Sequence, residues 1–156
     1  MRFLLLFLLC LPAAQGVELE IDGGEIGNAL VPYESALGRY SLEYPQHWQY
    51  FDLVNTTSFS DPSVSPDEAS FFSVLADRFP GIRTLGELNQ HLRFFHPDEI
   101  WRETEEAGLR GFTNSRSPRI YYLFRGSEDL LSIRYRAAVK EDEALVRAML
   151  RSLKTE

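Results

Sequence analysis

Cysteine is the scarcest feature of this sequence, and its scarcity excludes several kinds of protein. Cys10 is the only cysteine, and it lies inside an apolar run at residues 3–11. If that segment is removed as a signal peptide, the remaining chain has no disulfide, no thiolate nucleophile and no sulfur ligand for a metal. The fold must then be stabilised by packing alone.

Long apolar runs are equally scarce, and the run at 3–11 is too short to span a membrane. Nine helical residues would cover about 14 Å, whereas the hydrocarbon core of a bilayer is about 30 Å thick. Arg2 precedes the run and small residues follow it, which is typical of a cleaved secretory signal. The alternative is a lipoprotein modified on Cys10, and it is disfavoured because Leu9, not a small residue, precedes that cysteine.

We therefore predict a signal peptide at residues 1–16, a flexible leader at 17–29 and a single domain at 30–156. The mature protein is expected in the periplasm or outside the cell, with no transmembrane segment. The sequence carries no signal for a particular oligomeric state.

Lysine is also rare, because Lys140 and Lys154 are the only lysines among sixteen basic residues. This preference for arginine is typical of GC-rich bacterial genomes and fits a periplasmic setting. Removal of residues 1–16 takes away one basic residue and no acidic one, so the net charge changes from −7 to −8. Such an acidic protein is poorly suited to bind nucleic acid or an anionic bilayer.

Motifs of catalytic and metal sites are missing. The histidines His47, His91 and His96 have neither the i, i+4 spacing of a helical metal site nor an HExxH motif. No Gly-x-Ser-x-Gly elbow is present, and no glycine-rich stretch has the pattern of a nucleotide-binding loop. We therefore predict no enzymatic activity, no cofactor and no metal, although spacing does not test a triad assembled from distant residues.

Strand and helix patterns are what the chain does contain. Residues 40–44 alternate apolar and polar side chains, Pro45 ends that strand, and Trp48 brings a large ring to bury beside it. The spacing of Thr84 and Glu87 predicts a capping box at the start of a helix. The predicted apolar stripe of this helix consists of Leu85, Leu88, Leu92 and Phe95. Further strands are expected at 30–35, 48–54, 57–60, 70–77, 100–105, 109–114, 119–125 and 130–137, and a second helix at 142–153.

The last two predicted strands form a hairpin with a candidate binding face. A tight turn centred on Ser127 and Glu128 would pair Arg125 with Leu130 and place the apolar side chains on one face. The other face would then carry the candidate residues for an anion or a protein partner: Arg119, Tyr121, Arg125, Arg134 and Arg136. Clustered guanidinium groups can bind phosphate or an acidic patch. The alternative is a solvated face whose arginines pair with the acids of this protein or pack beneath a helix.

The order of these elements resembles that of the PsbP/DcrB-like superfamily. The resembling features are the strand ending in Tyr44-Pro45-x-x-Trp48, the helix after Thr84, the hairpin at 119–137 and the ending Met149-Leu150-Arg151-Ser152-Leu153-Lys154. The resemblance covers residues 30–154. It implies an α+β fold, an antiparallel sheet flanked by helices as an α/β/α sandwich, in exported proteins that mostly lack catalytic activity.

We therefore expect a non-enzymatic, exported accessory or protein-binding domain, with an envelope protein as its partner. The alternative is a periplasmic carrier of a small apolar or anionic ligand.

Overall fold

The structure is a computed structural model that describes residues 29–156, so the predicted signal peptide and most of the predicted leader lie outside the described residues. The described part of the chain forms ten strands and two helices. In chain order they are β1 (Leu30–Ser35), β2 (Tyr40–Pro45), β3 (Gln49–Leu53), β4 (Thr56–Ser60), β5 (Phe71–Arg78), α1 (Leu85–Phe95), β6 (Trp101–Glu106), β7 (Leu109–Asn114), β8 (Arg119–Gly126), β9 (Asp129–Arg136), α2 (Lys140–Ser152) and β10 (Lys154–Thr155). Within residues 29–156, neither helix is long and apolar enough to cross a membrane.

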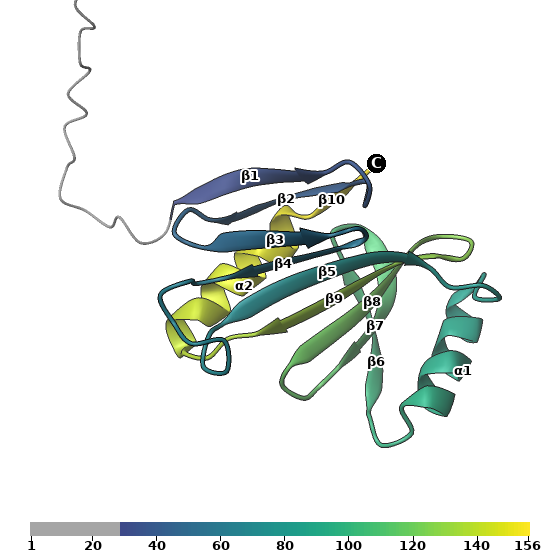
Figure 1. Cartoon of the computed structure of the whole chain (residues 1–156). Coiled ribbons are helices and arrows are strands. Elements are labelled where there is room, and N and C mark those ends of the chain that lie inside the picture. The colour runs from purple at the N-terminus through teal and green to yellow at the C-terminus, as the bar shows by residue number, and fades with distance from the viewer. Residues whose placement is uncertain (1–28) are drawn as a thin grey trace, which may run out of the picture.

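These elements form two antiparallel sheets (Figure 1). The small sheet has the order β1-β2-β10, and the large sheet has the order β3-β4-β5-β9-β8-β7-β6. The small sheet and α2 pack on one face of the large sheet, and α1 packs on the opposite face over β6 and β7. The prediction of an α+β fold with an antiparallel sheet flanked by helices is confirmed.

The main core lies between the large sheet, α2 and the small sheet. Leu42 from β2, Ile133 from β9 and Met149 from α2 are all buried there, and Trp48 is buried beside the end of β2 as predicted. Burial of one such side chain contributes about 1.5–3 kcal/mol. Since residues 29–156 contain no cysteine, this packing holds the two sheets together without a crosslink.

The predicted capping box at the start of α1 is confirmed. The side chain of Thr84 accepts a hydrogen bond from the backbone N–H of Glu87, and the Glu87 carboxylate accepts one from the backbone N–H of Thr84 at 2.9 Å. These two bonds satisfy N–H groups that the first turn of a helix leaves without partners. The cap therefore sets where α1 begins.

The apolar stripe of α1 is narrower than predicted. Leu88 and Leu92 are fully buried in a second core with Phe112 of β7. Phe95 was predicted on the same stripe, but it is 60% exposed, and its ring packs against His91 of its own helix at a centroid distance of 4.5 Å. The end of α1 thus presents an aromatic side chain to solvent.

The β8–β9 hairpin has a different register from the predicted one. Its turn is at Ser127 and Glu128 as predicted, but a β-bulge at Arg125 lets Phe124 pair with Leu130. Because side chains alternate along a strand, this shift of one residue exchanges the two faces of β8 relative to β9. The predicted shared apolar face is therefore wrong. The side chains on the α2 side are Tyr121, Leu123, Leu131, Ile133 and Tyr135, and those on the α1 side are Ile120, Tyr122, Phe124, Leu130 and Ser132.

Gly111 allows β7 and β8 to lie close together. A Cβ atom on Gly111 would overlap the carbonyl oxygen of Tyr122 and would lie 2.9 Å from the Cα of Leu123. Both neighbours are backbone atoms in a paired strand, so they cannot move aside as the end of a flexible side chain would. Only glycine therefore fits at this position without a steric clash.

Candidate functional site

The large sheet separates the five residues that were predicted to share one face. Arg119 and Tyr121 lie on the α2 side, where Tyr121 is buried in the main core. Arg134 and Arg136 lie on the opposite side, and Arg125 occupies the bulge. The bulge is the physical reason for this separation, because it moves β8 by one residue against β9. The prediction of a single arginine face is thus wrong.

Arg125 is part of the framework of the fold. Its side chain is only 8% exposed, and its guanidinium donates hydrogen bonds to the Asp129 carboxylate at 2.7 and 3.1 Å. It also donates to the carbonyl oxygens of Gly38 and Arg39 in the turn between β1 and β2. These bonds join the bulge to the small sheet. A guanidinium with so many internal partners has little capacity left for an external ligand.

Arg136 is likewise held by the protein, whereas Arg134 is free. The Nη2 of Arg136 donates to the carbonyl oxygens of Asp67 and Ala69 at 2.9 and 2.7 Å, which anchors the β4–β5 loop to the end of β9. Its guanidinium carbon also lies 5.5 Å from the centre of the Phe71 ring. Arg134 is exposed, and its side chain forms no ion pair or hydrogen bond with residues 29–156.

Arg134 belongs to a row of residues that crosses the uncovered half of the large sheet. The strand register places Phe51, Ser58, Ser73 and Arg134 side by side across β3, β4, β5 and β9. Directly paired residues share a face, and this face is the one opposite α2. Because α1 contacts β6 and β7, this half of the face is left uncovered (Figure 1). We call it the open sheet face, defined by Gln49, Phe51, Leu53, Ser58, Ser60, Phe71, Ser73, Leu75 and Arg134.

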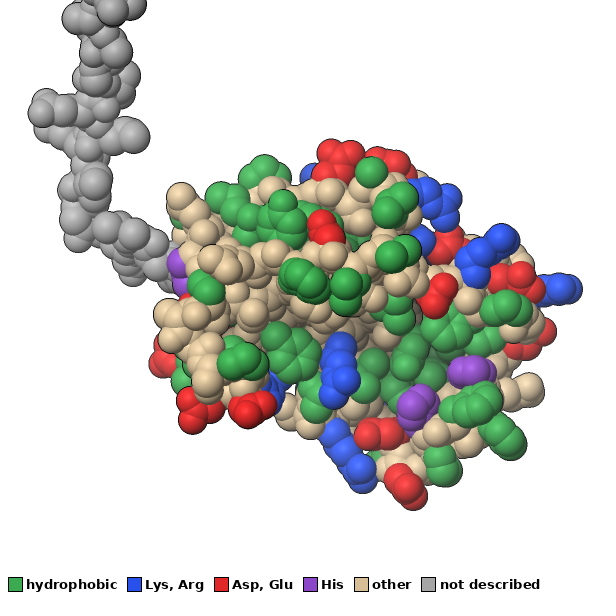
Figure 2. All heavy atoms as spheres, viewed as in Figure 1, with side chains coloured by type: hydrophobic (Ala, Val, Ile, Leu, Met, Phe, Trp, Pro, Cys, Tyr) green, Lys and Arg blue, Asp and Glu red, His purple; other side chains and the backbone are tan. Residues whose placement is uncertain are grey.

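A cavity of about 560 Å³ lies on the open sheet face, against the β4–β5 loop. The hydroxyls of Ser58 and Ser73 are 3.0 Å apart in this cavity, Arg134 lines it, and Val64 and Phe71 add apolar surface. Figure 2 shows this side of the molecule, where apolar side chains surround a hollow and basic side chains border it. Such a cavity suits a ligand or a partner side chain with an apolar body and an anionic end.

The carboxylate in the cavity wall, Asp61, is already engaged. Its Oδ1 accepts hydrogen bonds from the backbone N–H of Ser63 at 2.9 Å and from the Ser63 hydroxyl at 2.7 Å, and its Oδ2 lies 3.9 Å from His47 Nε2. The bonds from Ser63, helped by His47, hold the pKa of Asp61 below its usual range. Asp61 therefore stays ionised at neutral pH, and its carboxylate interacts with Ser63 and His47. Because it forms no ion pair with Arg134, the charge of Arg134 remains available.

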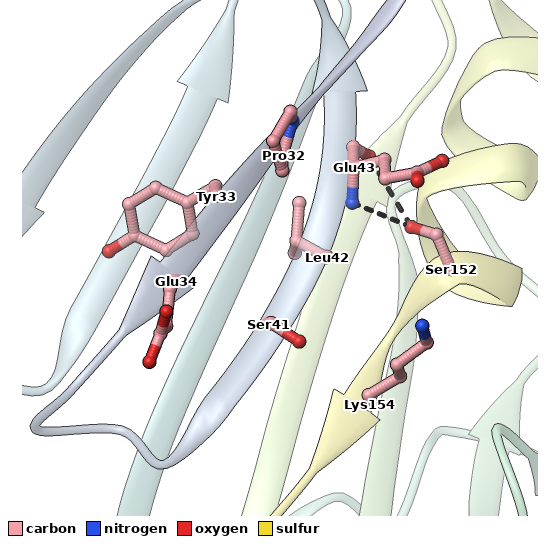
Figure 3. A pocket seen from close by; sticks show the side chains of 8 residues that line it. All are labelled: Pro32, Tyr33, Glu34, Ser41, Leu42, Glu43, Ser152 and Lys154. Atoms are coloured by element: carbon pink, nitrogen blue, oxygen red, sulfur yellow. Dashed lines mark hydrogen bonds between the residues drawn. The ribbon is translucent and has the colours of Figure 1, made fainter.

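A second groove, of about 450 Å³, lies beside the small sheet (Figure 3). Ser152 and Lys154 face β2 across it, and the Glu43 backbone N–H donates to Ser152 Oγ at 2.8 Å. The Ser152 hydroxyl in turn donates to the Met149 carbonyl at 2.8 Å. The groove thus lies where the C-terminal segment covers the edge of β2. Its charged residues have both signs, so it favours no one charge on a ligand.

Residues 29–156 contain no group of three or more His, Cys, Asp or Glu side chains placed to hold a metal. His47 lies near Asp61, His91 belongs to α1, and His96 packs edge-on against Trp101. What the open sheet face supplies is hydroxyl and guanidinium donors beside apolar surface. These are the requirements for binding an anionic, partly apolar group.

Sequence reasoning identified Arg134 but missed the serines beside it. A signal for them was present, because Ser58 alternates with Thr57 and Phe59 along β4, and both of those neighbours are buried. This alternation predicts a polar face on β4. The alignment of that face with Arg134 depends on the pairing of β5 with both β4 and β9, which no local pattern shows.

Comparison with known proteins gives a fold but no sequence family. No protein-family model matches the chain, and no curated protein matches it in sequence. Cyanobacterial PsbP (CyanoP) from Synechocystis sp. PCC 6803 superposes with a TM-score of 0.56 at 16% identity, over 86% of this chain and 96% of that protein.

A crystal structure from Bacteroides thetaiotaomicron VPI-5482 superposes with a TM-score of 0.51 at 14% identity, over 80% of this chain. The match covers 48% of that structure, so this chain spans about half of its length. The Ran-binding protein Mog1p of Saccharomyces cerevisiae is less similar, with a TM-score of 0.43 and 10% identity over 82% of this chain and 96% of that one.

The chain therefore has the PsbP-like fold, which confirms the resemblance seen in the order of its elements. At these identities the likeness concerns the fold and carries no residue roles.

Proposed function

We propose that this chain is a non-catalytic accessory domain, exported to the periplasm, that binds a protein partner through the open sheet face. The PsbP-like fold supports a binding or accessory role only as a fold-level analogy. The observation that carries the proposal is the row of Phe51, Ser58, Ser73 and Arg134, which crosses four strands beside a cavity of about 560 Å³ and has exposed side chains at both ends.

The edge of the sheet next to this row supports a protein as the partner. All five residues of β3 are exposed, including Phe51 at 66% and Leu53 at 57%. Asp52 is the one charged residue of β3, whereas β6 at the other edge carries four charged residues among six. Charged side chains keep edge strands from pairing with other chains, and β3 has little of this protection. An extended segment of a partner could therefore add to β3.

The chemistry of the cavity defines the partner segment further. Val64 and Phe71 offer apolar contact, while Arg134 and the paired hydroxyls of Ser58 and Ser73 can donate hydrogen bonds. A fitting segment carries an apolar side chain close to a carboxylate, since a guanidinium binds a carboxylate strongly through parallel hydrogen bonds. The proposed partner is accordingly an acidic, partly apolar protein segment of the cell envelope.

The volume of the cavity also favours a second candidate function. About 560 Å³ lies within the range of about 300–1,000 Å³ that small-molecule sites occupy. The same side chains would bind a small molecule with an apolar body and an anionic head. In that case the protein is a periplasmic carrier, and Arg134 holds the head group.

Site-specific photo-crosslinking in the native host tests the first function. A photoreactive residue in place of Phe51 should form an adduct with a single envelope protein, and the additional change Arg134→Glu should reduce the adduct about tenfold. The matched control is the same residue in place of Arg151, an exposed position on α2. Adducts that form equally from both positions, or that survive Arg134→Glu unchanged, contradict the proposal.

Native mass spectrometry of protein purified from the host separates the carrier from the accessory domain. A carrier should retain a small molecule in stoichiometric amount, and Arg134→Glu should release it. A protein free of small molecules, together with the adduct at position 51, supports the accessory domain.

Export is tested separately. Protein taken from the periplasmic fraction should begin at Val17, because the predicted signal ends at Gly16. Recovery of the uncleaved chain in the cytoplasmic fraction contradicts export without affecting the open sheet face.

A further inference from the structure

A smaller cavity, of about 240 Å³, lies where the β7–β8 loop meets the end of β9 and the first turn of α2. Three arginines and two serines contribute to its lining, namely Arg116, Arg119, Arg136, Ser115 and Ser117. Two of these arginines, Arg119 and Arg136, come from the predicted arginine face; they lie on opposite sides of the sheet but at the same end of it, where β8 begins and β9 ends. The tertiary structure brings them together with a loop that sequence reasoning had not selected.

Tyr135 lines this cavity and carries a buried hydroxyl without a partner. The residue is 3% exposed, and its hydroxyl oxygen makes no well-aligned hydrogen bond to residues 29–156, although the side chain of Tyr121 lies near it. The rings of Phe72 and Tyr121 stack against it at centroid distances of 6.2 and 6.1 Å, which keeps the ring in place. Burial raises the pKa of Tyr135, so the hydroxyl stays protonated and can donate. A buried donor without a partner calls for a water, an ion or a ligand.

The arginines of this cavity have donor capacity to spare. The Arg119 side chain forms no ion pair or hydrogen bond with the described residues, and the Nε of Arg136 is buried without a partner. Arg116 is exposed, and its closest carboxylate is that of Glu99 at 3.9 Å, a weak contact. None of the three guanidinium groups is thus neutralised by a close carboxylate within residues 29–156.

Glu143 is the acidic residue that lines the cavity, and it does not cancel this charge. Its carboxylate is bound to Arg147 at 2.8 Å, one turn further along α2. Arg147 in turn lies close enough to Tyr135 and Tyr121 to interact electrostatically with both. The groups that act on the Tyr135 hydroxyl are thus the side chain of Tyr121 and the ion pair of Glu143 and Arg147, which carries no net charge.

We propose that this cavity is a binding site for a phosphate group, either free inorganic phosphate or the phosphate of a small molecule. Arg116 and Arg119 supply the charge, the hydroxyls of Ser115 and Ser117 donate from the loop, and Tyr135 donates from β9. Donors that converge from a loop and two strands suit a tetrahedral anion better than a planar carboxylate. The volume equals that of about eight water molecules and is below the range of drug-sized pockets, which suits a small anion.

Calorimetric titration of the purified domain with inorganic phosphate, at constant ionic strength, tests the site. The wild type should bind one phosphate saturably. Tyr135→Phe should weaken binding about tenfold, because it removes one hydrogen bond to a charged group, and it should leave the Tm without phosphate unchanged or higher. Arg119→Gln should weaken binding at least as much, whereas the control Arg151→Gln should have no effect.

Arg116→Gln is a further variant for this titration. Because Arg116 is exposed on a loop, its replacement should weaken phosphate binding without affecting folding. A second titration with glycerol 3-phosphate identifies the source of the phosphate group. Binding about tenfold tighter than that of inorganic phosphate indicates a phosphorylated small molecule, and equal binding indicates the free anion. Absence of saturable binding up to about 10 mM of either compound overturns the proposal. Equal affinities of the wild type, Tyr135→Phe and Arg116→Gln overturn it as well.

Discussion

Replacement of Arg125 by alanine tests whether this side chain belongs to the framework of the fold. The change removes a buried guanidinium together with its hydrogen bonds to Asp129 and to the carbonyls of Gly38 and Arg39. It thereby removes the contacts that join the bulge in β8 to the turn of the small sheet. Arg134→Ala is the matched control, because Arg134 is exposed and has no such partner.

The expected loss of stability can be worked out from these contacts. Removing one member of a buried ion pair costs about 3–5 kcal/mol, because the other charge is left unpaired. Asp129 keeps a second ion pair, with Arg39 at 2.6 Å, so the loss should lie at the lower end, about 3 kcal/mol. In a domain of this size that loss lowers the Tm by about 10 °C. Arg134→Ala should change the free energy of unfolding by less than about 0.5 kcal/mol.

Urea unfolding followed by tryptophan fluorescence measures both variants. Trp48 is buried in the main core, so its emission reports the loss of that core. The two free energies of unfolding can be compared only if the m value is unchanged, because a changed m value indicates a different unfolded or native state. A loss below about 1 kcal/mol for Arg125→Ala, or equal losses for both variants, would refute the structural assignment of Arg125.

Three further predictions concern other parts of the fold. Gly111→Ala should cost about 3 kcal/mol or more in urea unfolding, because its Cβ overlaps the backbone of β8; Gly126→Ala, where a Cβ meets nothing within 4 Å, is the control. Thr84→Ala should cost about 1 kcal/mol and speed amide exchange in the first turn of α1, whereas Thr84→Ser should restore both. Burial raises the pKa of Tyr33 from 10.0 to about 12. Above pH 10 the unfolded state therefore releases this proton while the folded state keeps it, so stability should fall as the pH rises towards 12. Tyr33→Phe should make that fall less steep, and an unchanged slope contradicts the assignment.

Local patterns were enough to predict most elements and the fold class. The strand that ends at Pro45, the burial of Trp48 and the capping box of Thr84 all follow from residues within a few positions of one another. Their order along the chain was enough to indicate the PsbP-like fold. These predictions succeeded because each depends on short-range geometry that the residues themselves determine.

The candidate site required contacts between distant residues. Alternation in β8 and β9 predicts two faces for each strand, but it does not show how the two strands align. Arg125 decides that alignment through carbonyls of the β1–β2 turn more than 80 positions earlier in the chain. One extra residue at the bulge was therefore enough to separate the predicted arginine face.

The sequence by itself determined where most of the strands and helices lie, which residues cap or end them, and that their order is PsbP-like. Only the tertiary structure decided which half of the large sheet α1 leaves uncovered, and that Arg116, Arg119 and Tyr135 line one small cavity. The physical reason is that periodicity and capping act within a few residues. Sheet register and helix docking, by contrast, result from packing between segments that are far apart along the chain.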